Sequence, residues 1–337
     1  MKAVGLYKSL PIDHPESLVD IELPDPVATG HDLLVEVHAV SVNPVDVKVR
    51  MKATLAAGEP RVLGWDAAGI VRAVGEKVTR FKVGDRVWYA GQIDRPGSNA
   101  ELQLVDERIV GPVPTKLDFA EAAAMPLTAL TAWELLFDRL KVQEADPTQE
   151  NRLLVVGAAG GVGSILVQLA RRLTGLTIVA TASRQETRDW ALEQGAHYVI
   201  DHHQPWAEQL AQLGIGDVTH VASLTHTGSY IPQIVDVLRA EGQLGLIDDQ
   251  AQLDIMPFKA KALSVHWEMM FTRPVFKTST LARQHDILRK VATLVDAGVV
   301  RTTLARRIQG INATNLKEAH AQIETGTTRG KIVLEGF

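Results

Sequence analysis

The stretch that decides the fold is Leu153-Leu154-Val155-Val156-Gly157-Ala158-Ala159-Gly160-Gly161-Val162-Gly163-Ser164. Its apolar beginning predicts a buried strand, and the apolar residues that follow recur at helical spacing. A glycine-rich turn between such a strand and such a helix lets the backbone approach a pyrophosphate, which the helix N-terminus then faces. The pattern predicts a Rossmann unit that holds a dinucleotide at Ala159, Gly160, Gly161 and Val162. A plain flexible turn is the alternative.

The chain on the C-terminal side of this turn alternates between short apolar runs and longer amphipathic runs. We expect helices at 161–173 and 185–194, and strands at 178–181, 198–200, 218–222, 243–247 and 262–265. Alternation of strands and helices is typical of a parallel sheet with helices on its faces.

The chain before residue 115 has a different texture. Short β segments at 33–40, 67–75 and 85–90 are separated by glycine and proline, which predicts a small barrel. Helices are expected at 119–124 and 129–140, then from Ile287 to Val295 with Gly298 at the end, and at 315–325. A last strand at 331–334 is expected to return to the N-terminal part. The expected fold class is α/β, with a Rossmann-fold parallel sheet and a β-barrel domain.

Composition excludes several classes of protein. The chain has 337 residues, enough for two domains, and 46% of them are hydrophobic. Its net charge of -5 is not gathered into long runs of one sign, so we expect neither a nucleic acid nor a membrane as a partner. No apolar run resembles a signal peptide or a membrane span, so the expected location is the cytoplasm. The chain has no cysteine, which removes disulfides and every zinc site built on thiolates.

The end of the second Rossmann strand indicates which nicotinamide cofactor is bound. NAD-binding proteins place an Asp or Glu there for the ribose 2′-hydroxyl, whereas this strand ends in Ser183 and Arg184. Ser183 can donate to a 2′-phosphate, and Arg184 or Arg188 can neutralise it, so the sequence favours NADPH. Two alternatives stay open: Glu186 could reach the ribose of NADH, and the arginines could be a solvated helix start.

Five further motifs are spread along the chain. They are Asn43-Pro44-Val45-Asp46, Gly64-Trp65-Asp66-Ala67-Ala68-Gly69-Ile70-Val71, Val83-Gly84-Asp85-Arg86-Val87, Leu127-Thr128-Ala129-Leu130-Thr131-Ala132 and Gly330-Lys331-Ile332-Val333-Leu334. With the glycine turn, they resemble the medium-chain dehydrogenase/reductase superfamily. The similarity is to its quinone-oxidoreductase-like branch, which is also labelled zinc-type alcohol dehydrogenase-like.

The resemblance implies a domain organisation and an oligomeric state. Residues 1–126 and 273–337 would form a GroES-like catalytic domain, and residues 127–272 a Rossmann NADP-binding domain, with the cofactor in the cleft. Family members commonly form homodimers through an edge strand of the Rossmann sheet. The candidate here is the apolar segment 263–267, for which a buried core strand is the alternative.

The resemblance also implies where zinc would be bound, and the ligands are missing there. Zinc-dependent relatives carry a Cys where Val42-Asn43-Pro44 stands, a Gly-His-Glu where Gly64-Trp65-Asp66 stands, and another Cys or Asp later in the chain. They also have a four-cysteine lobe near residues 90–105. Catalytic zinc takes three protein ligands, which cannot be assembled at these positions. The 11 histidines could form a different site, but lone histidines are more often surface or core residues, so we expect no metal.

We expect the chemistry at Asn43, Asp46 and Thr131. By resemblance, Asn43 touches the nicotinamide ribose or the substrate, Asp46 orients Asn43 or lines the pocket, and Thr131 lies near the nicotinamide. The alternatives are a helix cap at Asn43 and Asp46, and a helix-interior position for Thr131. Arg329 or Lys331 would approach the cofactor from the C-terminal strand.

Several aromatic and sulfur-containing side chains are candidates for the substrate pocket. Trp65 could wall the pocket or belong to the core. Trp267, Met269, Met270 and Phe271 could shape an apolar slot for the substrate, and core packing is the alternative.

These features together predict a zinc-independent, NADPH-dependent oxidoreductase. Hydride transfer without a metal suits conjugated acceptors such as quinones and α,β-unsaturated carbonyls, because the developing charge spreads along the conjugated system. Solvent or Asp46 could supply the proton. The alternatives are a zinc-free alcohol or aldehyde reductase and a non-catalytic NADPH-binding sensor.

Overall fold

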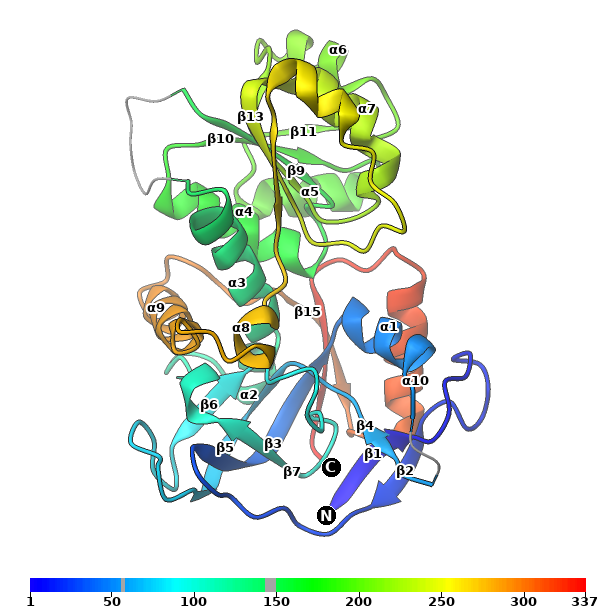
Figure 1. The fold of residues 1–337 in the computed structure, drawn as a ribbon, viewed down its shortest axis with the longest axis vertical. Coiled ribbons are helices and arrows are strands. Elements are labelled where there is room, and N and C mark those ends of the chain that lie inside the picture. Colours follow the sequence, from blue (N-terminus) through cyan, green and yellow to red (C-terminus); the bar gives the residue numbers. More distant parts are fainter. Residues whose placement is uncertain (56–57, 143–149) are drawn as a thin grey trace. The chain divides into compact units, whose positions relative to one another are not determined.

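The computed structural model describes residues 1–55, 58–142 and 150–337. The chain divides into two compact units. The terminal unit consists of Met1–Leu130 and Phe271–Phe337, and the central unit consists of Thr131–Met270 (Figure 1). Within the described residues, no helix is long and apolar enough to cross a membrane.

The central unit is built on a six-stranded sheet in which every pair of neighbouring strands is parallel. Its strands are β9 (Arg152–Val156), β10 (Thr177–Thr181), β11 (Tyr198–Ile200), β12 (Val218–Ser223), β13 (Leu238–Leu246) and β14 (Ser264–Trp267). Their order across the sheet is β11-β10-β9-β12-β13-β14, which is the Rossmann order. The parallel sheet that the sequence predicts is therefore confirmed. Strands β10 and β11 are added on one side of β9, and β12, β13 and β14 on the other side. The strand order therefore switches between β9 and β12, and such sheets bind ligands at this switch point, at the carboxyl ends of the strands.

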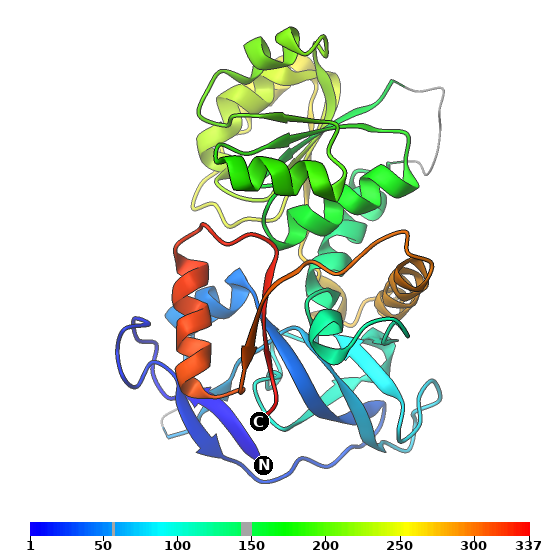
Figure 2. The same ribbon diagram turned by 180° about the vertical axis from the view of Figure 1, so that it is seen from behind.

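Helices cover both faces of this sheet. They are α4 (Gly161–Leu173), α5 (Gln185–Gln194), α6 (Trp206–Gln212), α7 (Thr227–Val237) and the short 3-10 helix η3 (Met256–Lys261). Helix α7 lies in front of the sheet in Figure 1, and the green helices α4 and α5 lie in front of it in Figure 2. The sequence predicts the bounds of α4 and α5 but not α7, because Pro232 interrupts its helical pattern.

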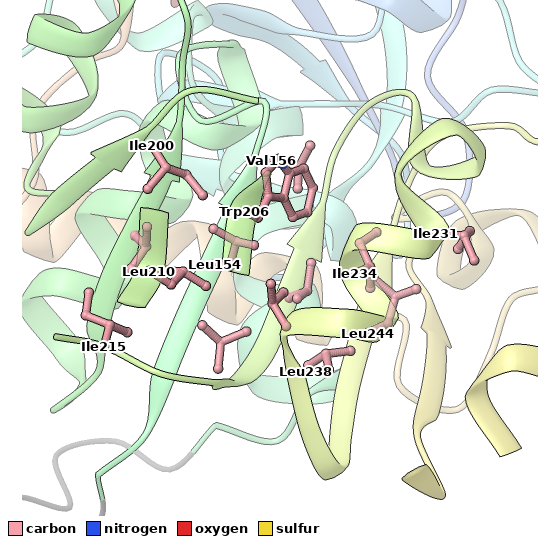
Figure 3. Close-up of a cluster of buried hydrophobic side chains, with 14 of the residues drawn as sticks. Leu154, Val156, Ile200, Trp206, Leu210, Ile215, Ile231, Ile234, Leu238 and Leu244 are labelled. Atoms are coloured by element: carbon pink, nitrogen blue, oxygen red, sulfur yellow. The ribbon is translucent and has the colours of Figure 1, made fainter. Parts of the chain in front are cut away.

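A cluster of buried apolar side chains packs against the central strands (Figure 3). Leu154 and Val156 of β9 meet Trp206 of α6 and Ile234 of α7 there. These strands are buried on both faces, which explains why they read as continuous apolar runs in the sequence.

The predicted helix at 129–140 is two elements, α3 (Pro126–Trp133) and the π-helix η2 (Glu134–Arg139). Glu134 and Glu268 are both buried, and Arg139 Nε donates to Glu268 Oε2 at 2.7 Å. Burial and the nearby Glu134 raise the pKa of Glu268. This contact joins η2 to the residue that follows β14. A pattern of apolar residues along the sequence cannot predict a contact between residues so far apart.

Strand β14 is the last strand in the order of the central sheet. Its residues are partly exposed, and 52% of the surface of Trp267 is accessible. The segment is therefore an edge strand and not a buried core strand.

The terminal unit contains a seven-stranded and a three-stranded sheet. The larger follows the order β15-β16-β3-β5-β6-β8, with β7 paired to β3, and the smaller the order β2-β1-β4. The strands are β1 (Lys2–Leu6), β2 (Val19–Glu22), β3 (Asp32–Val42), β4 (Arg61–Val62), β5 (Ala67–Val74), β6 (Arg86–Tyr89), β7 (Leu102–Asp106), β8 (Val110–Pro112), β15 (Leu304–Gln309) and β16 (Lys331–Glu335). Strand β16 pairs antiparallel with β3, so the C-terminal strand belongs to the sheet of the N-terminal segment.

The helices of the terminal unit connect and flank these strands. They are α1 (Pro44–Lys52), the 3-10 helix η1 (Glu107–Ile109), α2 (Phe119–Ala123), α8 (Thr272–Val275), α9 (Arg283–Asp296) and α10 (Ala313–Glu324), and α3 begins in this unit. Helix α1 lies beside α10, as Figure 1 shows. The pairing of β16 with β3 places Ile332 opposite Val42, which brings the start of β16 to the junction between β3 and α1.

Candidate active site

Asn43 joins the end of β3 to the start of α1. Its backbone is extended, and Pro44 occupies the first helical position, where the missing N–H has no cost. Asp46 lies at the third helical position, and its Oδ2 accepts from the backbone N–H of Asn43 at 2.7 Å. This bond is half of a capping box, so the cap interpretation of Asp46 has a geometric basis.

The side chain of Asn43 is buried and faces Asp66. Its Nδ2 donates to Asp66 Oδ2 at 2.9 Å and to the carbonyl oxygen of Ser41 at 3.3 Å. Its Oδ1 accepts from the ammonium group of Lys331. The carboxamide therefore has a donor side and an acceptor side that face opposite charges.

Asp66 precedes β5 and is fully buried. Its Oδ1 accepts from the backbone N–H of Leu127 at 2.8 Å, in the first turn of α3. Its Oδ2 accepts from Asn43 and, at 3.0 Å, from Lys331 Nζ. A carboxylate at a helix N-terminus is favoured by the unpaired N–H groups and the dipole of the helix.

Lys331 is the first residue of β16, and it is 3% exposed. Its Nζ donates to the carbonyl oxygen of Val42 at 3.1 Å, to Asn43 Oδ1 and to Asp66 Oδ2. An ammonium group has three N–H donors, so this set uses all of them. We call Asn43, Asp46, Asp66 and Lys331 the lysine cluster.

The lysine cluster holds two carboxyl groups that titrate differently from free ones. Burial raises the pKa of Asp46 to about 7, although the Asn43 N–H and the Lys331 charge oppose the shift. Burial also raises the pKa of Asp66, against the Lys331 charge and the hydrogen bond from Asn43. Asp46 therefore keeps its proton to a higher pH than a free aspartate does.

The residues at the family's zinc positions do not fit a zinc ion. Asn43 and Asp66 already hold the Lys331 ammonium group, whose charge would repel a metal. Trp65 is fully buried, and its Nε1 donates to the carbonyl oxygen of Gln92 at 3.2 Å. Across residues 1–55, 58–142 and 150–337, no group of three or more His, Asp or Glu is placed to hold a metal.

The remaining pocket candidates differ in burial. Trp65 packs against Phe271, with ring centroids 6.2 Å apart, and both belong to the core of the terminal unit. Met270 is buried, whereas Trp267 and Met269 are more than half exposed. Trp65, Met270 and Phe271 are therefore packed in the core. The four residues predicted to shape one apolar slot, 267 and 269–271, differ in burial and do not share one environment.

The glycine turn of the central unit has the conformation that its sequence predicts. Gly157 follows β9 with a φ of 78°, in the left-handed region that favours glycine. A Cβ on Gly163 would lie 2.5 Å from the carbonyl oxygens of Gly157 and Ala158, so α4 can pack against the turn because residue 163 is glycine. Gly160 caps α4, whose first N–H groups have no partner within the helix. These residues fit a dinucleotide pyrophosphate.

The arginines after β10 have distinct surroundings. Arg184 caps α5, and its Nη1 lies 3.4 Å from Glu186 Oε1. Arg188 donates to the carbonyl oxygens of Ala182 and Val199, at 3.1 and 3.0 Å. Arg188 therefore ties the end of β10 to β11, while Ser183 and Arg184 lie together at the carboxyl end of β10.

The structure brings together part of the predicted site. Asn43 and Asp46 share the lysine cluster with Asp66 and Lys331, whereas Thr131 belongs to the central unit and Arg329 is exposed. Sequence reasoning does not single out Asp66, and it directs Lys331 toward the cofactor. The signal that could have identified both is a charged residue at the edge of an apolar run, in Gly64-Trp65-Asp66-Ala67-Ala68 and in Gly330-Lys331-Ile332-Val333-Leu334.

Two family models match the chain. Residues 29–115 match the alcohol dehydrogenase GroES-like domain, and residues 194–334 match the zinc-binding dehydrogenase model. The chain is 35% identical over 337 residues to a zinc-type alcohol dehydrogenase-like protein of Staphylococcus epidermidis, and the match covers 99% of each chain. It is also 35% identical over 193 residues to the quinone oxidoreductase of Mus musculus, across 57% of this chain and 56% of the other.

Solved structures share the fold. A proposed zinc-dependent alcohol dehydrogenase protein from Rhizobium etli CFN 42 superposes with a TM-score of 0.96 at 56% identity, covering 100% of this chain and 98% of that one. The Escherichia coli quinone oxidoreductase superposes with a TM-score of 0.84 at 24% identity over 100% of both chains, a likeness of fold. The full-length similarity to curated relatives, the GroES-like match and the Rossmann strand order agree: the chain belongs to the medium-chain dehydrogenase/reductase superfamily and is an oxidoreductase of that type.

Proposed function

We propose that this oxidoreductase is zinc-independent, uses NADPH, and reduces quinones or α,β-unsaturated carbonyl compounds. The observation that carries the proposal is the lysine cluster, in which an ammonium group is bonded to residues of the two motifs that carry zinc ligands in zinc-dependent relatives. The name of the mouse quinone oxidoreductase supports the acceptor class.

The acceptor class follows from what polarises the substrate. Bound NADPH supplies a hydride to the acceptor. Reduction of an isolated ketone builds charge on one oxygen and needs a strong electrophile, usually a metal or a Tyr/Lys pair. A conjugated acceptor spreads that charge, so positioning by the protein and one proton donor suffice.

Each predicted residue has a proposed role. Ala159, Gly160, Gly161 and Val162 hold the pyrophosphate, and Ser183 and Arg184 bind the 2′-phosphate. Arg188 shapes that site by fixing the ends of β10 and β11. Asn43 offers the second lone pair of its Oδ1 to the ribose or the substrate, and Thr131 and Arg329 contact the cofactor.

Asp46 is the proposed proton donor. A pKa of about 7 leaves it protonated in a large fraction of molecules at neutral pH, which suits a general acid. The same side chain accepts from the Asn43 N–H, so its position is fixed by the cap.

A screen of acceptors tests the proposed function. We expect NADPH oxidation with quinones and enones at least about 10-fold faster, in kcat/KM, than with simple aldehydes or ketones. Faster turnover of aldehydes would favour the alcohol or aldehyde reductase that the names of the curated relatives suggest. NADPH binding at micromolar concentration without turnover of any acceptor would favour the sensor.

The cofactor assignment predicts the effect of Ser183→Asp. A carboxylate at this position repels a 2′-phosphate and accepts from a 2′-hydroxyl, so the preference for NADPH over NADH should fall by roughly 10-fold or more. Binding of both cofactors can be measured by fluorescence titration. Glu186→Gln is the matched control and should leave the preference unchanged; a loss of NADH binding in that variant would instead identify Glu186 as the ribose ligand.

The raised pKa of Asp46 predicts the pH dependence of Asp46→Asn. The folded protein holds a proton on Asp46 between about pH 4 and 7 that the unfolded chain has lost, so rising pH weakens the wild type by about 1.4 kcal/mol per unit. Asn keeps the cap acceptor and cannot ionise. The free energy of unfolding of the variant, relative to that of the wild type, should therefore rise from pH 5 to 7. Above pH 7 the difference between the two should stay constant.

Turnover then separates the two interpretations of Asp46. A general acid predicts that Asp46→Asn lowers kcat by about 10²-fold or more. An unchanged kcat in a stable variant would leave Asp46 as a cap alone.

We also propose a cytoplasmic homodimer joined through β14. An exposed edge strand that carries the half-exposed Trp267 can extend its sheet with the same strand of a second copy. Sedimentation should give twice the chain mass, and Val265→Pro, which removes a strand donor, should give a monomer. A monomeric wild type would contradict the dimer, and recovery from the membrane fraction would contradict the location.

A further inference from the structure

Lys331 places a buried positive charge between residues of the two motifs in which zinc-dependent relatives carry metal ligands. We infer that Lys331 is a positioning residue: its ammonium group is an internal cation that takes over the organising role of a metal and fixes the Asn43 carboxamide. The catalytic part of this inference rests on the proposed function, whereas the structural part does not.

The ammonium group has the surroundings of a bound cation. Its acceptors are the Val42 carbonyl oxygen at the end of β3, Asn43 Oδ1 at the start of α1 and Asp66 Oδ2 before β5. The side chain that carries it comes from β16, far along the chain. One charge thus adds side-chain bonds between segments that backbone pairing already brings side by side, since Ile332 lies opposite Val42 and the Ser41 N–H donates to the carbonyl oxygen of Asp66.

Charge balance explains why the cation is needed. Asp66 is fully buried, and a buried carboxylate without a partner is strongly unfavourable. Lys331 Nζ lies 3.0 Å from Asp66 Oδ2 and supplies the counter-charge. Asp46 interacts electrostatically with both Lys331 and Asp66, and it is the third ionisable group of the cluster.

The same cation determines how Asn43 is oriented. Asn43 Oδ1 faces the ammonium group, and Asn43 Nδ2 faces the Asp66 carboxylate at 2.9 Å. A flipped amide would place NH₂ against an ammonium group and an oxygen against a carboxylate. Lys331 and Asp66 therefore fix which side of the Asn43 carboxamide carries the oxygen, while Lys331 itself has no N–H left to donate.

The structural part is tested by melting temperatures of Lys331→Met, Asp66→Asn and the double variant. Lys331→Met removes the charge and keeps an unbranched side chain, so Asp66 loses its counter-charge. We expect a fall of roughly 10 °C, partly restored in the double variant because the unpaired carboxylate is gone. Lys82→Met, on an exposed lysine of the same unit, is the control and should melt like the wild type.

Two results would overturn the structural part. One is a Lys331→Met variant that melts with the wild type. The other is a double variant that melts no higher than Lys331→Met, which would mean that the charge on Asp66 is not what Lys331 balances. If Lys331→Met does not fold, the double variant, which lacks the Asp66 carboxylate, decides the question by folding or failing to fold.

The catalytic part is tested on the folded variants with NADPH and a quinone. A positioning role predicts a kcat lowered by about 10-fold or more in the double variant, with the Kd for NADPH changed by less than about 3-fold. Unchanged kcat would overturn it, as would an equal loss in NADPH binding, which would make Lys331 a cofactor ligand. If the wild type turns over no acceptor, the proposed function fails, while the melting data still decide whether Lys331 is the internal cation.

Discussion

The buried ammonium group of Lys331 is the interaction on which the candidate active site depends. Removing an ion from water costs several kcal/mol unless hydrogen bonds and an opposite charge replace the solvent. Val42, Asn43 and Asp66 provide these replacements, and Asp66 extends the network to the first turn of α3. The conformation of the turn between β3 and α1 is therefore coupled to the position of the C-terminal strand.

The glycine turn of the central unit depends on backbone geometry and not on buried charge. A pyrophosphate needs N–H donors and close approach of the backbone, which Gly157 and Gly163 allow at the carboxyl end of β9. The sheet order places this turn beside the end of β12, at the switch point of the sheet. The proposed cofactor site thus rests on backbone geometry, whereas the lysine cluster rests on buried charge.

The sequence predicts the central unit well and the lysine cluster in part. Strong apolar periodicity and glycine spacing predict α4 to the residue and β9 to within one residue at its start, because the signals are local. Helix α7 is missed because Pro232 breaks its pattern, whereas a helix over the residues of η2 is predicted and only its π form is not. Asp66 and Lys331 are 265 residues apart, and no local pattern reports that their side chains form an ion pair.

Metal dependence is the most direct measurement on the central claim. Quinone reduction with NADPH should be measured before and after exhaustive treatment with a chelator, together with the metal content of the untreated protein. The account predicts substoichiometric zinc and equal kcat/KM in both samples, because Lys331 occupies the place of the cation. Stoichiometric zinc, with activity lost on chelation and restored by zinc, would contradict it.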